Sequence, residues 1–138
     1  EAPAAAEEAY AAYSRISDLI SAEGGRDAQR IAPYVTEEVL ASELEAAAFL
    51  ESRGWRAIGH PTVTKFDLQQ YSETRTQAEI TVYVCLDVST VAIVNADGKD
   101  VTPANRDSKV ALEVGFTGNA RDALLISSSE QWPDSSIC

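Results

Sequence analysis

The chain has 138 residues, 45% of them hydrophobic and 24% charged, which suits one domain with a substantial core and excludes a disordered protein. Its 22 acidic and 11 basic residues give a net charge of −11. This balance excludes nucleic-acid binding, which needs a cationic surface, and the lack of a long apolar run predicts no membrane insertion of the mature domain.

The N-terminal segment is rich in alanine, proline and glutamate over residues 1–8. Such a composition resembles the spacer that follows a removed signal peptide, or the spacer between a lipid-modified cysteine and its domain. The chain also contains no methionine, as expected of a processed product. We therefore expect a tail over residues 1–8 and one domain over residues 9–138. The protein is expected to be secreted or to lie at the cell surface, either free or attached through a lipid anchor.

The first half of the chain has helical periodicity. Apolar residues recur at helical spacing over residues 5–23, and Gly24-Gly25 suits a left-handed helix end. A short helical turn is expected over residues 28–31, ended by Pro33.

A second amphipathic helix is expected from Thr36, a typical N-cap residue, to Arg53, with Gly54 after its end. Two glutamates in its first turn suit the helix dipole. Its expected inward positions are Val39, Leu40, Leu44, Ala47, Ala48 and Leu50.

The second half has a period of two, as in strands with one buried face. Residues 78–88 alternate between apolar even positions and mostly polar odd positions, and residues 109–117 repeat the pattern. Further strands are expected over residues 62–71, 90–94 and 123–129, with turns at Asp97-Gly98 and Gly118-Asn119. The order predicts an α+β fold in which N-terminal helices pack on the concave face of a curved antiparallel meander.

The two cysteines are expected to form one structural disulfide. Cys85 lies on the polar face of its strand and Cys138 is the last residue. A metal site would need ligand spacing that these residues and the single His60 lack, and a redox pair would normally be a CxxC. The bridge would hold the C-terminal segment against the outer face or the edge of the sheet and stabilise the fold by about 4 kcal/mol in the chain-entropy model.

This element order resembles the nuclear transport factor 2-like superfamily, with its ketosteroid isomerase-like cone, and in particular small secreted proteins and lipoproteins of actinobacteria. The segments that carry the resemblance are residues 13–20, 24–25, 32–36, 54–59, 82–87 and 95–98, with Trp132 before Cys138. The resemblance implies a cone-shaped cavity between sheet and helices, which serves as an active site, a ligand site or a non-catalytic binding site in different members.

An isomerase-like site would combine a tyrosine of the first helix with an acid inside the cone. Tyr10 or Tyr13 could supply the first and Asp67 or Glu113 the second. Glu113 has the parity of the polar outer face, and the face of Asp67 is ambiguous, while the predicted inner face is almost wholly aliphatic. We therefore assign no catalytic residue.

Two other motifs favour structural interpretations. His60 lies at a helix-to-strand junction with no partner at motif distance. The segment Asn95–Gly98 suggests a calcium loop, but Ile93 and Ala104 occupy positions where carboxylates are needed, so a hairpin turn is preferred. No metal and no cofactor are expected.

Tyr13, Trp55 and Phe66 are the candidates for lining a ligand pocket, with ordinary core packing as the alternative. The favoured hypothesis is an exported, monomeric, non-catalytic binding or accessory domain of the cell envelope, with an unknown protein partner or a small apolar ligand. The alternatives are a cavity enzyme of the isomerase or dehydratase type and a structural spacer. An open cone with a converging acid and tyrosine would favour the enzyme.

Overall fold

Helices precede all the strands in the computed structural model, which describes residues 2–118, 124–133 and 138. The elements are α1 (Ala2–Ala22), the 3-10 helix η1 (Ala28–Tyr34), α2 (Glu37–Arg53), β1 (Arg56–Ile58), β2 (Thr62–Glu73), β3 (Ala78–Asp87), β4 (Ala92–Val94), β5 (Lys109–Gly118) and β6 (Leu125–Gln131). The predicted α+β class is confirmed.

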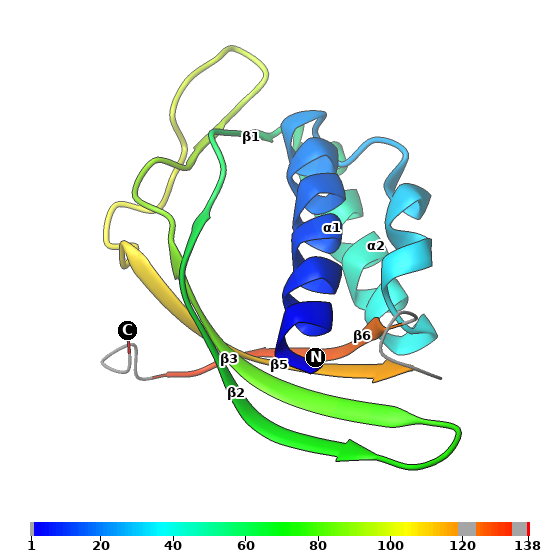
Figure 1. Ribbon diagram of the computed structural model, residues 1–138. Coiled ribbons are helices and arrows are strands. Elements are labelled where there is room, and N and C mark those ends of the chain that lie inside the picture. The colour runs from blue at the N-terminus through cyan, green and yellow to red at the C-terminus, as the bar shows by residue number, and fades with distance from the viewer. Residues whose placement is uncertain (1, 119–123, 134–137) are drawn as a thin grey trace.

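The main sheet is antiparallel, with strand order β2-β3-β5-β6. It curves around the helices, so that α1 and α2 lie on its concave side (Figure 1). The expected meander was wrong at β4, which pairs with β1 in a separate two-stranded ribbon, with Arg56 opposite Val94. With only three residues, β1 is too short to produce a visible alternation, and it was missed.

The core lies between the concave face and the helices. The even positions of β3 are buried as the alternation predicted, and Ala78, Ile80, Val82 and Val84 are each at most 1% exposed. Phe116 from β5 and Ile31 from η1 pack in the same cluster. The sheet face that the helices cover is therefore closely packed around the middle strands.

Both long helices end as the glycines predicted. Gly24, after α1, has φ +74°. The Gly25 N–H donates to the Ile20 carbonyl at 2.8 Å, and the Gly24 N–H donates to the Ser21 carbonyl at 3.1 Å. This is the Schellman pattern, in which a left-handed residue satisfies the last helical carbonyls. Gly54, with φ +68°, ends α2 in the same way.

The N-terminal segment differs from the expected tail. Residues 2–8 form the first turns of α1, and the side chain of Ala6 is fully buried in the core. Alanine has the highest helix propensity, so this composition suits a helix as well as it suits a spacer.

Local expectations around α2 need three corrections. Pro33 lies inside η1 instead of ending it, because the fixed φ of proline is compatible with a 3-10 helix. Thr36 precedes α2, but its backbone N–H donates to Ile126 at 2.9 Å, and its hydroxyl is buried without a hydrogen-bond partner instead of capping the helix. Ala48, expected inside, is exposed.

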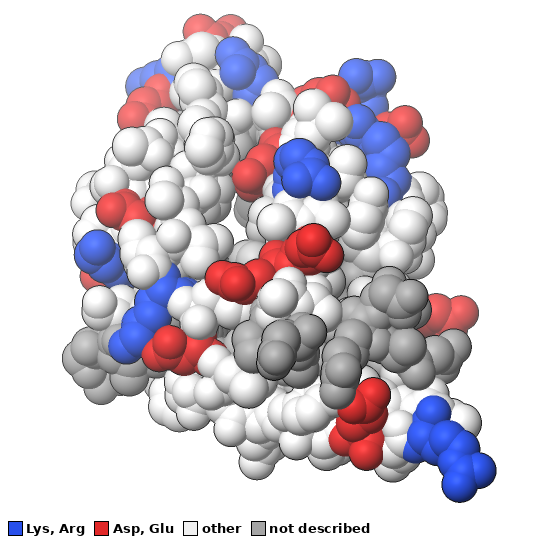
Figure 2. All heavy atoms as spheres, viewed as in Figure 1, with Lys and Arg blue, Asp and Glu red and all other residues white. Residues whose placement is uncertain are grey.

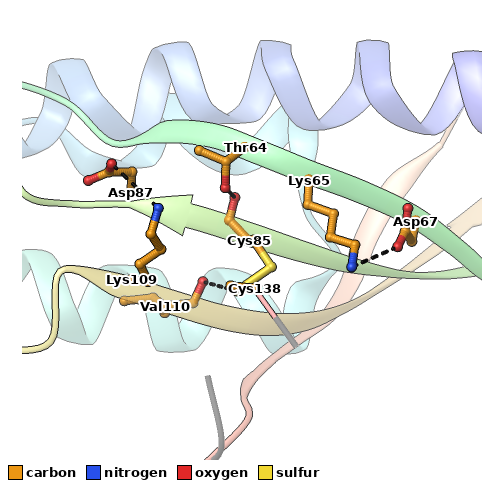
Figure 3. The surroundings of a disulfide bond; sticks show 8 residues. All are labelled: Thr64, Lys65, Asp67, Cys85, Asp87, Lys109, Val110 and Cys138. Carbon is orange, nitrogen blue, oxygen red and sulfur yellow. Dashed lines mark hydrogen bonds and ion pairs between the residues drawn. A yellow bond between two sulfur atoms is a disulfide. The ribbon is translucent and has the colours of Figure 1, made fainter. Parts of the chain in front are cut away.

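The predicted disulfide joins Cys85 and Cys138, whose Cα atoms lie 5.6 Å apart (Figure 3). Trp132, the residue after β6, packs on the convex face: its N–H donates to the Ala111 carbonyl at 2.8 Å, and its ring lies edge-on to that of Tyr83 with the ring centres 5.2 Å apart. Cys85, bonded to Cys138, is 1% exposed although it lies on the face that was predicted to be polar.

Two expected features lie partly outside the described residues: the start of the last strand at Ala123 and the turn at Gly118-Asn119. Within the described part of the chain, no helix is both long enough and apolar enough to cross a bilayer.

Candidate functional site

A groove of about 630 Å³ lies between α1 and β2, and we call it the α1–β2 groove. Its walls are formed by Glu7, Tyr10, Ala11, Ser14, Arg15, Asp18, His60, Val63 and Phe66. Figure 2, drawn from the same side as Figure 1, shows acidic side chains gathered over the middle of this face, where α1 crosses in front of the sheet. The groove thus combines an apolar floor with a mostly polar helical wall.

The helical wall follows from the period of α1. Glu7, Ala11, Ser14 and Asp18 are three or four positions apart, so they share one side of the helix, next to the stripe that enters the core. Ala11 and Ser14 are small and leave room between the helix and the strand. These four residues were not predicted as part of a site, although their helical spacing is visible in the sequence.

The floor on β2 depends on two β-bulges. The pairing with β3 shifts between Val63 and Lys65 and again between Leu68 and Gln70. Each shift exchanges the faces to which later residues point. As a result, Val63, Phe66 and Leu68 all lie opposite even-numbered, apolar residues of β3 and face the concave side.

Three aromatic rings, those of Tyr10, Tyr13 and Phe66, lie next to one another where α1 faces β2. The Tyr10 ring lies 6.2 Å from that of Phe66 and 5.7 Å from that of Tyr13. The Tyr13 hydroxyl donates to the Glu43 carboxylate of α2 at 2.7 Å. A smaller pocket of about 190 Å³ shares Tyr10 and Asp18 with the groove and extends it over the concave face. The concave side is therefore open next to α1.

Burial favours the neutral forms of three titratable groups in the groove and the adjoining smaller pocket, namely Tyr10, Tyr13 and Asp18. Burial raises the pKa of Tyr10 to about 12, and burial together with the Glu43 carboxylate raises the pKa of Tyr13. Desolvation raises the pKa of Asp18, while the positive charge of His60 lowers it to a lesser extent. Both phenols remain protonated at neutral pH and are able to donate hydrogen bonds.

The structure brings two of the three predicted pocket residues together. Phe66 lines the groove, and Tyr13 lines the adjoining smaller pocket. Trp55 lies apart from them, just after α2. Its ring centre is 5.9 Å from that of Phe49, and the Cζ atom of Arg53 lies 5.6 Å from the centre of the Trp55 ring. This separation follows from the position of Trp55 between α2 and β1, where the aromatic and cationic side chains at the end of α2 are its neighbours.

The two acids of the isomerase-like hypothesis lie on the wrong side of the sheet for that chemistry. Asp67 pairs in register with Tyr83 and forms an ion pair with Lys65 at 3.6 Å on the convex face, where Figure 3 shows it. Glu113 lies opposite the same Tyr83 from β5. Neither carboxylate can reach a ligand beside Tyr10.

His60, for which a structural role was preferred, is exposed and lines the groove, so it stands close enough to Asp18 to influence that carboxyl group. No group of three or more histidine, cysteine, aspartate or glutamate residues is arranged to hold a metal ion among the described residues. The groove itself offers apolar contacts, hydrogen-bonding groups, and the carboxyl, guanidinium and imidazole groups at its wall.

No family model matches the chain, and no curated protein matches it. A similar solved structure is the intermembrane space region of the chloroplast protein ARC6, with a TM-score of 0.66 over 97% of this chain and 98% of that chain at 12% identity. A de novo designed β-sheet protein also matches, with a TM-score of 0.36 and 16% identity over 94% of this chain and 88% of that chain, which is too distant to support an argument. The similarity to the ARC6 region concerns the fold alone.

Proposed function

We propose that this protein is an exported, non-catalytic binding domain whose α1–β2 groove holds a small apolar ligand or an apolar part of a partner protein. The observation that carries the proposal is the groove itself, open beside α1 and floored by Val63 and Phe66. Concave, mostly apolar sites with a few polar groups are the usual form of binding sites in proteins.

Export is supported by the disulfide, because such bridges persist mainly in oxidising compartments. The ARC6 region with the similar fold is described as lying in an intermembrane space, which is compatible with an extracytoplasmic protein. The helices-then-sheet order and the open concave side also agree with the resemblance to the nuclear transport factor 2-like superfamily, which we retain as part of the proposal.

The binding proposal is tested with Nile red, a neutral dye whose fluorescence rises in apolar surroundings. Ala11 is exposed at the groove wall, so Ala11→Trp fills the groove without displacing a core residue. We expect it to weaken dye binding at least about tenfold, which corresponds to about 1.4 kcal/mol. The matched control is Ala41→Trp on the exposed side of α2, which should leave binding unchanged. Equal binding by both variants would rule out the groove as the site.

A cavity enzyme is a second candidate because Tyr10, Asp18 and His60 line one groove, and desolvation raises the pKa of Asp18. In such an enzyme the Asp18 carboxylate would remove a proton from the carbon next to a substrate carbonyl and return it to a different carbon of the same molecule. A phenol would donate a hydrogen bond to the carbonyl oxygen. The test is the conversion of a β,γ-unsaturated cyclic ketone to its conjugated isomer. Activity that is lost in Asp18→Asn supports the enzyme, and no conversion by the native protein argues against it.

A further inference from the structure

The side chain of Asp18 lies where the α1–β2 groove meets the smaller pocket of the concave face. Asp18 lines both spaces, together with Tyr10, Ser14 and Val63. It is half-buried, in contrast to the exposed Glu7 at the other end of the helical wall. A ligand that fills the groove and extends into the smaller pocket therefore lies against the Asp18 carboxyl group.

This carboxyl group has no partner of opposite charge at ion-pair distance, and it accepts no hydrogen bond, within the described residues. Asp87 provides the contrast, because it accepts a hydrogen bond from the Ser89 N–H at 2.9 Å and forms an ion pair with Lys109 at 3.9 Å. Burial raises the pKa of Asp18, and only the more distant charge of His60 opposes this effect. The ionised Asp18 side chain thus bears a desolvation cost that a bound cation would offset.

Hydrocarbon surface continues from this carboxyl group along the groove. On the floor, Val63 is 44% exposed and Phe66 is half-buried. The Tyr10 ring lies 6.2 Å from that of Phe66, and the Asp18 charge adds to the effect of burial that raises the pKa of Tyr10 to about 12. Glu7 and Asp18 are about 16 Å apart along the axis of α1, so the apolar stretch between them suits an extended hydrocarbon chain.

The charges around the groove favour a cation over an anion. Its two basic residues, Arg15 and His60, are exposed, and neither forms an ion pair with Glu7 or Asp18 in the part of the chain that the structure describes. The whole chain has a net charge of −11. This field attracts cations to the protein and repels anions, which would have only the two basic groups at the groove rim to bind.

We propose that the α1–β2 groove binds a small amphiphilic amine, with its hydrocarbon chain on Val63 and Phe66 and its ammonium group donating hydrogen bonds to the Asp18 carboxylate. The inference rests on the proposed function and deepens it by specifying a small-molecule ligand and the charge of its polar end. Hydrogen bonds between two ionised groups are stronger than neutral ones, and the neighbouring Tyr10 ring adds a surface that attracts cations.

The test compares three ligands that share one hydrocarbon chain, namely octylamine, octanol and octanoate. Isothermal titration calorimetry of the whole protein at pH 7 and low ionic strength measures the three dissociation constants. We expect octylamine to bind at least about fivefold more tightly than octanol, and octanoate to bind most weakly. Ethylamine, which has the ammonium group without the long chain, should bind at least about tenfold more weakly than octylamine.

Asp18→Asn and Asp97→Asn form a matched pair, because each removes one aspartate charge from the chain. Asp97 is exposed in the turn after β4 and does not line the groove. We expect Asp18→Asn to weaken octylamine binding at least about fivefold, with octanol binding unchanged within about twofold, whereas Asp97→Asn changes neither by more than about twofold. In the native protein, octylamine should also lower the pKa of Asp18, followed by NMR of its carboxyl carbon, because an ammonium group stabilises the ionised form.

Each contrary result separates this inference from the proposed function. Equal binding of octylamine and octanol, or an Asp18→Asn variant that binds octylamine as the native protein does, would overturn the amine assignment and leave groove binding intact. Tighter binding of octanoate would overturn it too and would assign the polar end of the ligand to Arg15. Equal weakening by Asp97→Asn would attribute the effect to long-range charge and overturn the contact with Asp18. Failure of all three ligands overturns the inference, and equal Nile red binding by Ala11→Trp and Ala41→Trp as well would overturn both proposals.

Discussion

Single residues determine how closely the helices approach each other and how polar the groove becomes. Gly25 has φ +87° and lies where α1 meets α2, so that a Cβ atom there would come within 2.2 Å of the Ala47 carbonyl oxygen. Asp18 brings a carboxyl group into a partly desolvated position at the groove wall. The first residue fixes the packing of the helices, and the second contributes to the chemistry of the site.

Gly25→Ala should destabilise the fold by about 3 kcal/mol or more, because it adds a clash with the backbone of α2 to the cost of a left-handed alanine. Gly98→Ala is the matched control, since its φ is +82° but nothing lies within 4 Å of the added Cβ, and about 1 kcal/mol is expected. Denaturant unfolding measures both values, and equal losses would contradict the close approach at Gly25.

Asp18→Asn should raise the melting temperature at pH 7. Burial raises the pKa of Asp18 in the folded state, so folding favours the protonated form, and the corresponding stability is lost as pH rises through the folded pKa. The advantage of the Asp18→Asn variant should therefore shrink below about pH 4, where the carboxyl is protonated in both states. Glu8→Gln, an exposed change on the same helix, is the control in thermal melts at the two pH values. A native protein more stable than Asp18→Asn at pH 7 would contradict this account.

Elements with regular patterns were predictable from the sequence, and irregular ones were not. The alternation of β3 and the glycines after α1 and α2 predicted a buried strand face and two helix ends that the structure confirms. The bulges of β2 were not visible, because an extra residue breaks the alternation without leaving a motif. This break made the face of Asp67 ambiguous and hid the concave row of Val63, Phe66 and Leu68.

The site was predictable only in part for the same reason. Tyr13 and Phe66 were identified as aromatic pocket candidates, but their connection runs through Tyr10, which only the folded geometry reveals. Trp55 looked equivalent in the sequence, yet its neighbours at the end of α2 hold it away from the groove. Tertiary placement, which depends on long-range packing, decided which aromatic residues meet.

The disulfide attaches the C-terminal residue to β3 across a sequence separation of 53 residues. The double variant Cys85→Ala, Cys138→Ala should lower the free energy of unfolding by about 4 kcal/mol, mainly because the unfolded chain regains loop entropy. Denaturant unfolding of the native protein with and without a reductant provides the comparison. A loss below about 1 kcal/mol would contradict this entropic account of the disulfide.

At the scale of the whole molecule, a chain with a net charge of −11 forms an apolar groove between α1 and β2, the terminal strand of the main sheet as described. The excess of 22 acidic over 11 basic residues is expected to oppose contact between copies of the chain. This combination accounts for an open apolar groove in a protein that is not expected to self-associate.

Sedimentation velocity at low micromolar concentration should therefore show a monomer, because self-association would bring together two molecules of net charge −11. High salt, which screens this repulsion, is the informative comparison. A stable dimer at low ionic strength would contradict the proposed role of the charge.

The most direct test of the α1–β2 groove as the binding site is NMR mapping of the native protein during titration with Nile red. We expect the largest amide shift changes at residues of the groove wall and floor, such as Ala11, Ser14 and Phe66. Changes centred on Phe49 and Trp55 at the end of α2, or on the convex face of the sheet, would contradict the proposed site.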